Sequence, residues 1–289
     1  MTYELITDSC ANLTEEQIET LDLHIVSMLF TIGGEECVSY TKGQHTDLKQ
    51  FYDRMRQKEK VTTSQINGET FLKLMEPMLQ AGQDVLYIAF SSALSGTCQA
   101  ANIAADTLRE KYPQRKIVVV DSLAASMGEG LLVYYAANMR LEGKSIDEVA
   151  DWVSGNRLRL CHWFTVDDLF FLHRGGRVSS ASAVLGTVLG VKPVLHVDDE
   201  GRLILVGKTR GRKKSLDELV ARMEQTIENP QEQVIFISHG DAPEDAAYVE
   251  RLVREKFAVK DVVLNYIDPV IGGHSGPGTV ALFFLGSKR

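Results

Sequence analysis

Short runs of β-branched and apolar residues alternate with longer amphipathic segments along the first half of the chain. Residues 3–8 (YELITD), 84–90 (DVLYIAF) and 116–121 (KIVVVD) have the composition of strands, and a polar turn follows each of them. Residues 97–111 and 123–142 have the periodicity of helices, and a glycine follows the second one as a typical stop. Alternation of this kind predicts a mostly parallel sheet that is covered by helices.

A different pattern begins near residue 156. Residues 160–166 (LCHWFTV), 193–198 (PVLHVD) and 202–209 (RLILVGKT) resemble strands, and residues 198–201 (DDEG) have the composition of a hairpin turn. A hairpin joins antiparallel neighbours, so the second half of the chain is expected to form a mixed α+β sheet.

The length and the composition allow two domains. With 289 residues and 44% hydrophobic content, the chain can bury a sizeable core. Residues 145–148 (SIDE) have the pattern of a capping box that opens one more helix before the texture changes. We therefore expect an α/β protein with an N-terminal domain of mostly parallel sheet at 1–155 and a C-terminal α+β domain at 156–289.

Charge and hydropathy exclude several classes of function. No apolar run approaches the roughly 18 residues of a membrane span, and the first residues lack the pattern of a signal peptide, so a cytoplasmic location is expected. A net charge of -8 argues against general nucleic-acid binding, which depends on neutralising phosphates. The histidines show no metal-binding spacing. The four cysteines form no CxxC pair and are expected to be buried or incidental thiols: Cys10, Cys37, Cys98 and Cys161.

Hydroxyl side chains crowd the junction between a predicted strand and a predicted helix at residues 91–97 (SSALSGT). Ser95 or a neighbour can cap the helix, but a cap accounts for one hydroxyl only. The amino-terminal end of a helix also attracts anions through its unpaired N–H groups and its dipole. Because the segment contains no lysine or arginine, a phosphate loop is absent and a carboxylate is the better candidate.

A second cluster of polar side chains, residues 61–68 (VTTSQING), precedes another amphipathic segment. A helix cap is again the simple explanation. If both clusters follow strands of one parallel sheet, they meet at the edge where such sheets usually bind ligands.

Three further patterns leave other functions open. Serine hydrolysis would use Ser91 or Ser95 with His274, but the GxSxG elbow is missing because Ala93 stands where it needs glycine. The segment 271–279 (IGGHSGPGT) is expected to be a flexible turn whose glycines let the backbone approach a ligand near His274. Residues 127–132 (MGEGLL) have only two glycines of a dinucleotide fingerprint.

Two basic segments suggest contacts with phosphate or with a partner. Arg174 and Arg177 flank a turn that either binds phosphate, as in a nucleotide-binding protein, or simply separates two helices. Residues 202–214 (RLILVGKTRGRKK) hold six basic residues and no acidic one in an otherwise acidic chain. This stretch is either a solvated strand and helix start or a surface for an acidic partner: Arg202, Lys208, Arg210, Arg212, Lys213 and Lys214.

Seven motifs occur in a recognisable order and cover essentially the whole chain: TDSCANL, TTSQ, SSALSGT, DDLFFLHRGGRVSS with GVKPVLHVDDEGRL, KTRGRKK and IGGHSGPG. Together they resemble the DegV family of bacterial fatty-acid-binding proteins. The resemblance implies two α/β-type domains with a long-chain fatty acid buried between them. It also implies a carrier without catalytic residues or a cofactor, which presents the acid to a cytosolic fatty acid kinase for acyl-phosphate formation and phospholipid synthesis.

The resemblance also implies roles for particular residues. The family's carboxylate-binding residues correspond to Thr63 in TTSQ, Ser95 in SSALSGT and His274 in IGGHSGPG. Two hydroxyls and helix N–H groups would compensate a buried carboxylate without a fixed counter-ion. Candidate residues for the tail pocket lie in 169–172 (LFFL) and 182–190 (SAVLGTVLG), and candidate partner or phosphate contacts are Arg174, Arg177, Arg210 and Lys213.

Overall fold

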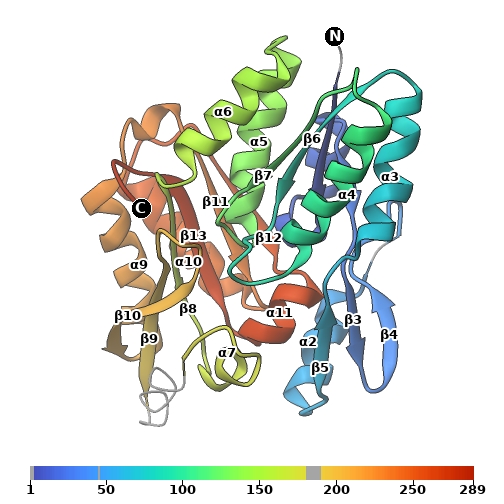
Figure 1. Cartoon of the computed structure of the whole chain (residues 1–289). Coiled ribbons are helices and arrows are strands. Elements are labelled where there is room, and N and C mark those ends of the chain that lie inside the picture. Colours follow the sequence, from blue (N-terminus) through green and yellow to red (C-terminus); the bar gives the residue numbers. More distant parts are fainter. Residues whose placement is uncertain (1–2, 45, 180–189) are drawn as a thin grey trace.

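The computed structural model describes residues 3–44, 46–179 and 190–289, which form three sheets and the helices around them (Figure 1). The strands are β1 (Tyr3–Asp8), β2 (His24–Val26), β3 (Leu29–Ile32), β4 (Glu35–Val38), β5 (Val61–Ser64), β6 (Asp84–Ala89), β7 (Ile117–Asp121), β8 (Leu160–Thr165), β9 (Val191–Val197), β10 (Leu203–Arg210), β11 (Val234–His239), β12 (Asp261–Tyr266) and β13 (Val280–Leu285). The helices are α1 (Glu15–Thr20), α2 (Leu48–Arg56), α3 (Gly68–Gln80), α4 (Thr97–Lys111), α5 (Met127–Leu141), α6 (Ile146–Asn156), α7 (Phe170–Arg174), α9 (Arg212–Thr226), α10 (Pro243–Lys256) and α11 (Pro269–Ser275).

The first sheet is parallel throughout and has the strand order β2-β1-β6-β7. Its strands are apolar on both faces because helices cover both. Val85, Tyr87 and Ala89 of β6 pack in one apolar cluster with α3 and α4, whereas Leu86 and Ile88 pack in another with α5 and α6. The predicted parallel sheet is therefore confirmed.

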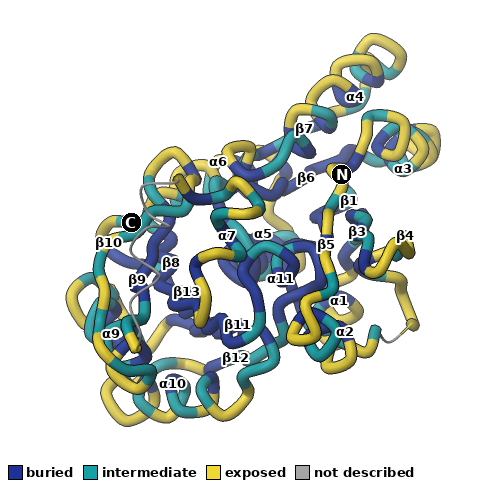
Figure 2. The backbone as a smooth tube through the Cα atoms, turned by 90° about the horizontal axis from the view of Figure 1, so that it is seen from below, coloured by how far each residue is buried: buried dark blue, intermediate teal, exposed yellow. Residues whose placement is uncertain are grey.

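The second sheet is mixed and has the strand order β10-β9-β8-β13-β11-β12. Only β11 and β12 are parallel, and β9 and β10 form the expected hairpin. Side chains of α9 and α10 join the apolar cluster on one face of the sheet. Figure 2 shows its central strands β8, β13 and β11 buried and the outward sides of these helices exposed.

The third sheet is small and antiparallel, with the order β4-β3-β5. The prediction that the cluster at 61–68 follows a strand of the parallel sheet is therefore wrong. Residues 61–64 pair with β3 instead, and Thr63 lies opposite Phe30. Pairing with a segment about thirty residues earlier in the chain is a tertiary choice that local pattern does not reveal.

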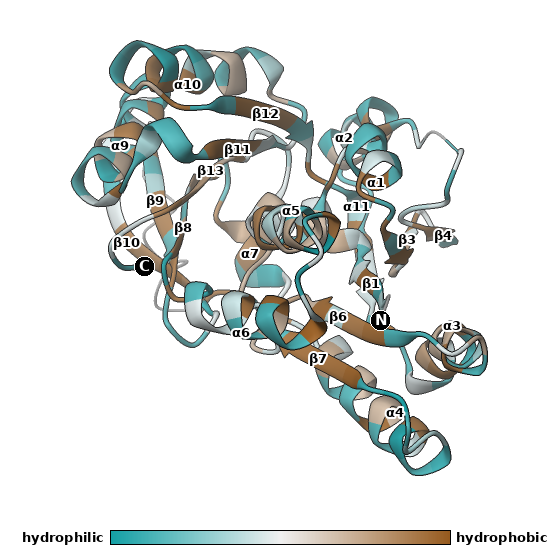
Figure 3. Cartoon of the chain, turned by 90° about the horizontal axis from the view of Figure 1, so that it is seen from above, coloured by the Kyte–Doolittle hydropathy of each residue, from teal (hydrophilic) through white to brown (hydrophobic). Residues whose placement is uncertain are grey.

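Helix α5 lies between the two larger sheets (Figure 3) and shares one apolar cluster with both of them. Its close packing explains the glycines of the weak dinucleotide pattern. A Cβ atom at Gly128 would lie 2.4 Å from the His162 ring, and one at Gly130 would lie 2.3 Å from the Ala11 carbonyl oxygen. These glycines stand inside a helix, so they form no dinucleotide-binding turn. A domain boundary near residue 155 stays a prediction.

Two further expectations concern the surface and the thiols. Within the described ranges, no helix is both long and apolar enough to cross a membrane. The thiols of Cys10, Cys98 and Cys161 are buried and unbridged, as expected, and that of Cys37 is partly exposed.

Candidate functional site

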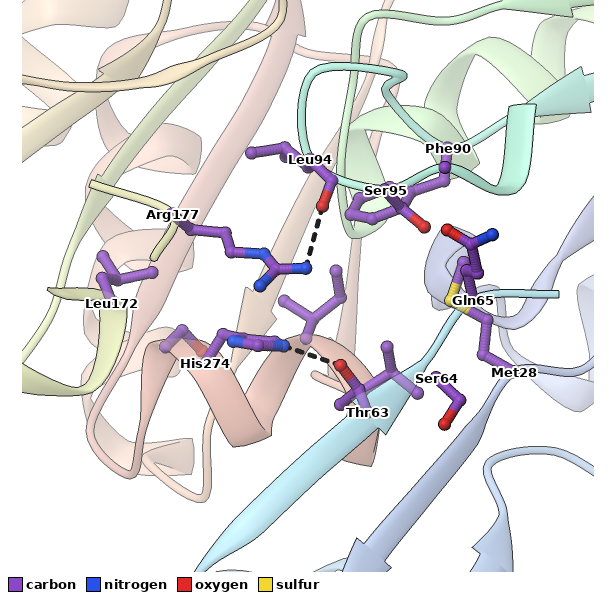
Figure 4. Close-up of a pocket in the computed structure, with 14 residues that line it drawn as sticks. Met28, Thr63, Ser64, Gln65, Phe90, Leu94, Ser95, Leu172, Arg177 and His274 are labelled. Carbon is purple, nitrogen blue, oxygen red and sulfur yellow. Dashed lines mark hydrogen bonds between the residues drawn. The ribbon is translucent and has the colours of Figure 1, made fainter. Parts of the chain in front are cut away.

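A cavity of about 310 Å³ lies where the small sheet, the start of α4, the turn after α7 and helix α11 meet (Figure 4). Its wall combines a few polar side chains with apolar ones, which is typical of small-molecule sites. The lining residues are Met28, Thr63, Ser64, Gln65, Phe90, Leu94, Ser95, Gly96, Leu172, Arg177, Val270, Ile271, His274 and Ser275. The structure thus brings Thr63, Ser95 and His274 together, although they are far apart in the chain.

Thr63 and His274 form a hydrogen bond across the cavity. The Oγ1 atom of Thr63, on β5, lies 2.8 Å from Nε2 of His274, on α11. Burial and, after it, the positive charges of Arg177 and Arg174 lower the pKa of His274 to about 4. The ring is therefore neutral near pH 7, with one nitrogen that donates and one that accepts.

Residues 271–275 of the predicted turn belong to helix α11, so the prediction is wrong around His274, whereas residues 276–279 form a turn before β13. Asp268 caps α11 by accepting hydrogen bonds from the backbone N–H groups of Val270 and Ile271, and Pro269 occupies the first helical position. The Asp268 carboxylate also accepts hydrogen bonds from Ser39 Oγ at 2.6 Å and Asn12 Nδ2 at 3.0 Å. This buried network fixes the start of the helix that carries His274.

The glycines of α11 serve close packing. A Cβ atom at Gly272 would lie 2.4 Å from the Tyr52 hydroxyl, and one at Gly273 would lie 2.6 Å from Cγ1 of Val61. Both contacts would force neighbouring atoms to move. Glycine therefore lets α11 approach α2 and β5 closely enough for His274 to reach Thr63.

Ser95 belongs to a chain of hydrogen bonds that joins the two hydroxyl clusters. Its Oγ atom accepts from the Thr97 N–H at 3.3 Å and lies 2.9 Å from Thr97 Oγ1. The Ile66 N–H donates to the same Thr97 Oγ1 at 3.2 Å. Gly96 rather than Ser95 occupies the N-cap position of α4, so Ser95 caps only the first helical N–H group.

The geometry gives no hydrolytic triad with the serines that the sequence suggested. Ser91 is buried, and its hydroxyl donates to the Gly201 carbonyl oxygen at 2.9 Å, where it ties the β9–β10 hairpin to the loop after β6. Ser95 bonds to Thr97, and His274 bonds to Thr63. In the part of the chain that the structure describes, no carboxylate is hydrogen-bonded to His274.

Arg177 supplies a positive charge to the cavity wall, contrary to the expectation that the site has no fixed counter-ion. Its guanidinium donates to the carbonyl oxygen of Leu94 at 3.1 Å (Figure 4) and also to that of Gly175. Arg174 is exposed and lies over the Phe171 ring at 5.1 Å, outside the set that lines the cavity. Of the two arginines at this turn, only Arg177 is therefore placed to meet a ligand there.

The basic stretch of residues 202–214 divides into paired and exposed side chains. Arg212 is half-buried between Asp245 at 2.7 Å and Asp167 at 3.6 Å. Lys208 and Arg210 point outward from β10, the edge strand of the mixed sheet. Lys213 is also exposed and lies over the Tyr248 ring at 4.9 Å. Arg212 therefore has a structural role, which the sequence pattern did not distinguish.

An inner cavity of about 50 Å³ adjoins the first one and shares Ile271 and Ser275 with it. The apolar wall of the larger cavity includes Leu172, from the candidate tail segment at 169–172, whereas Phe170 of the same segment is exposed. Residues 182–189 of the second candidate tail segment lie outside the described residues. Polar groups at one end and an apolar interior at the other suit an amphiphilic anion.

Comparison with known proteins gives a family for this arrangement. A family model described as "Uncharacterised protein, DegV family" matches residues 2–287. A DegV domain-containing protein of Clostridium perfringens is 45% identical over 99% of this chain and 98% of its own length. A DegV domain-containing protein of Lactococcus lactis is 38% identical over 100% of this chain and 99% of its own.

Solved structures agree in fold over the full length. A DegV family protein of Thermus thermophilus, described by its fatty acid binding, is 29% identical and has a TM-score of 0.88, with 99% of this chain and 100% of that one covered. A fatty acid binding DegV family protein of Streptococcus agalactiae is also 29% identical, with a TM-score of 0.84 and 100% of both chains covered. The α/β architecture of this chain is therefore that of the DegV structures.

Proposed function

This chain belongs to the DegV family, and from that membership we propose that it binds a long-chain fatty acid with the carboxylate at Thr63, Ser95 and His274. The observation that carries the proposal is the meeting of these three side chains at the polar end of one cavity. Two solved relatives are described as fatty-acid-binding proteins, which supports the ligand class.

The hydrogen bonds at the cavity are compatible with two hydroxyl protons for the carboxylate. In the tautomer of His274 that is protonated at Nε2, the ring donates to Thr63, and the Thr63 proton is left for the ligand. When Thr97, which accepts from the Ile66 N–H, donates to Ser95, the Ser95 proton is left for the ligand as well. Hydrogen bonds to a charged acceptor are worth about 1.5–3 kcal/mol each.

Arg177 adds electrostatic stabilisation to these neutral donors. A buried carboxylate is costly unless charge or hydrogen bonds compensate it. The guanidinium keeps its charge in proteins, and it already holds two backbone carbonyl groups at the cavity wall. The guanidinium therefore favours an anion at the polar end, and its two bonds to backbone carbonyl groups keep it at the cavity wall.

The hydrocarbon tail would supply most of the affinity. A chain with about 14 buried methylenes gains roughly 11 kcal/mol gross, at about 0.8 kcal/mol each. In this proposal the tail runs from the polar end past Ile271 toward the inner cavity. Candidate walls are the apolar side chains of the two cavities.

We further propose that the protein is a carrier in the cytoplasm and presents the carboxylate to a separate fatty acid kinase for phospholipid synthesis. Arg210, at the end of β10, and Lys213, at the start of α9, are exposed. The opposite end of β10 lies nearer to the site. Arg202 to Leu205, at the other end of β10, border a groove that shares Leu94 and Arg177 with the cavity. Basic side chains at this groove and at the far end of β10 would steer an acidic, ATP-bearing partner.

Mass spectrometry of the purified protein after extraction with organic solvent tests the ligand class. A fatty acid in stoichiometric amount is expected. A nucleotide in its place would favour the phosphate-binding alternative, in which Arg174 and Arg177 hold the ligand.

Ester hydrolysis by the protein alone tests the carrier role. No turnover of acyl esters or thioesters is expected, because the nucleophile elbow and a carboxylate partner for His274 are missing from the described residues. Esterase activity that disappears in Ser95→Ala would instead identify an acyl hydrolase that uses Ser95 and His274.

A further inference from the structure

The inner cavity contains polar atoms without partners. It lies against the face of the mixed sheet that is turned toward α5, and most of its wall is apolar, with Phe164 and Phe283 among its side chains. His162 and Ser275 also line it. The other two polar side chains of the wall, Ser126 and Thr279, have hydrogen-bond partners within the protein.

His162 is almost completely buried, with 1% of its surface exposed, and it lies opposite Phe283 in the sheet. Neither of its ring nitrogens has a hydrogen-bond partner among the residues that the structure describes. Burial lowers the pKa of His162 far below its ordinary value. The Leu160 backbone raises this pKa, but it forms no hydrogen bond of ordinary geometry with the ring. The ring is neutral, so it offers one donor and one acceptor.

Ser275 is in the same situation on the opposite wall. It is the last residue of α11, is 5% exposed, and its Oγ atom has no partner within the described ranges. Buried polar atoms in native proteins are nearly always hydrogen-bonded, so two unpaired groups at one cavity require an explanation.

The packing of α5 against the mixed sheet leaves space for the His162 ring. A Cβ atom at Gly128 would lie 2.4 Å from Cδ2 and Nε2 of the ring, so α5 has a glycine where the ring needs space. Thr165, on the same strand, provides a contrast: its hydroxyl is also buried and unpaired, but it lines neither cavity.

We propose that His162 and Ser275 form a second polar subsite that binds a hydroxyl group on the acyl chain, so that the protein prefers hydroxylated fatty acids. The inference rests on the proposed fatty-acid binding. A hydroxyl both donates and accepts, as a neutral imidazole does, whereas a plain hydrocarbon leaves the ring nitrogens unpaired. A second carboxylate fits less well, because the positive charge of the site, Arg177, lines the other cavity.

Binding of octadecanoic acid and of isomers with one hydroxyl at successive positions along the chain tests the subsite. An isomer whose hydroxyl reaches His162 is expected to bind about two- to twelve-fold more tightly than octadecanoic acid, the range of one net hydrogen bond. The isomer hydroxylated next to the carboxylate should gain nothing. Ser275→Ala and His162→Phe should each reduce the preference, and the matched control Thr165→Val should keep it.

The outcomes separate this inference from the proposed function. If octadecanoic acid binds and no isomer is preferred, or if the preference survives both Ser275→Ala and His162→Phe, the subsite is refuted while fatty-acid binding stands. If none of the acids binds, the proposed function fails with it. Ser275→Ala removes a single oxygen atom, so it keeps the test valid should His162→Phe fail to fold.

Discussion

The larger cavity and the inner cavity, here called the outer and the inner end of the site, differ in whether their polar side chains have hydrogen-bond partners. At the outer end, Thr63 and Arg177 have partners from distant parts of the chain, and Ser95 is bonded to the nearby Thr97. At the inner end, His162 and Ser275 have none among the described residues. A network that is already paired holds its donors in place before the ligand arrives, so less order has to be created on binding. In the proposed binding mode, the outer end fixes the head group and the inner end selects the chain.

The largest expected effect comes from chain length. Shortening octadecanoic acid to dodecanoic acid removes six methylenes and should cost about 5 kcal/mol, or roughly three-thousandfold in affinity, if all of them are buried. Displacement of a fluorescent fatty acid by the series of saturated acids measures this. An affinity that hardly changes with length would mean that the tail lies outside the apolar interior.

The next effect concerns the outer end. Thr63→Ala and Ser95→Ala should each weaken fatty-acid binding by about 10- to 150-fold, because each removes one hydrogen bond to a charged group. Thr62→Ala is the matched control, since Thr62 is exposed on the same strand and does not line the cavity. Unchanged affinity in both site variants, with melting temperatures like that of the control, would remove these hydroxyls from the site.

Titration of the histidines by NMR compares the two ends directly. In the free protein, His274 should titrate with a pKa of about 4, and the pKa of His162 should lie well below its ordinary value because the ring is buried. Arg177→Gln should raise the pKa of His274, because a nearby positive charge disfavours the protonated ring. A bound carboxylate should raise it too. If neither Arg177→Gln nor a bound carboxylate changes the pKa of His274, the guanidinium and the ligand do not lie near the ring.

The smallest expected effect concerns the partner surface. Reversing Arg210 and Lys213 to glutamate should slow acyl phosphorylation by a cognate kinase several-fold at low salt, and less at high salt, because exposed charges mainly steer association. Fatty-acid affinity should stay the same. Reversal of Arg251 and Lys256, exposed on α10, makes the same charge change elsewhere and should have no effect. Equal rates in both double variants would exclude the basic strand as the docking surface.

The parts of the fold that local pattern predicts are the ones with strong periodicity. The apolar runs of β1, β6, β7 and β8 are strands, and Ser145 and Glu148 form the predicted capping box of α6. Helix α11 was missed because its glycines resemble a loop. The pair Asp268–Pro269 is an N-cap followed by a favoured first residue, and it is the signal that could have revealed the helix.

The sequence indicated residues that line one cavity, but it did not indicate their geometry. The motifs indicated Thr63, Ser95 and His274, whereas the bond between Thr63 and His274 depends on α11 crossing to a third sheet. In the sequence, Arg177 and Arg174 are two equivalent arginines of a basic turn. Only tertiary packing shows that Arg177 lines the cavity and Arg174 does not. His162 stands in an apolar strand, where the sequence alone does not show whether its nitrogens find partners.

A crystal structure with octadecanoic acid tests the central claim most directly. The account predicts that the carboxylate oxygens lie within hydrogen-bonding distance of Thr63 Oγ1 and Ser95 Oγ, with the tail directed past Ile271 toward His162. A carboxylate at His162 with the tail toward Thr63, or a ligand bound outside the two cavities, would contradict it.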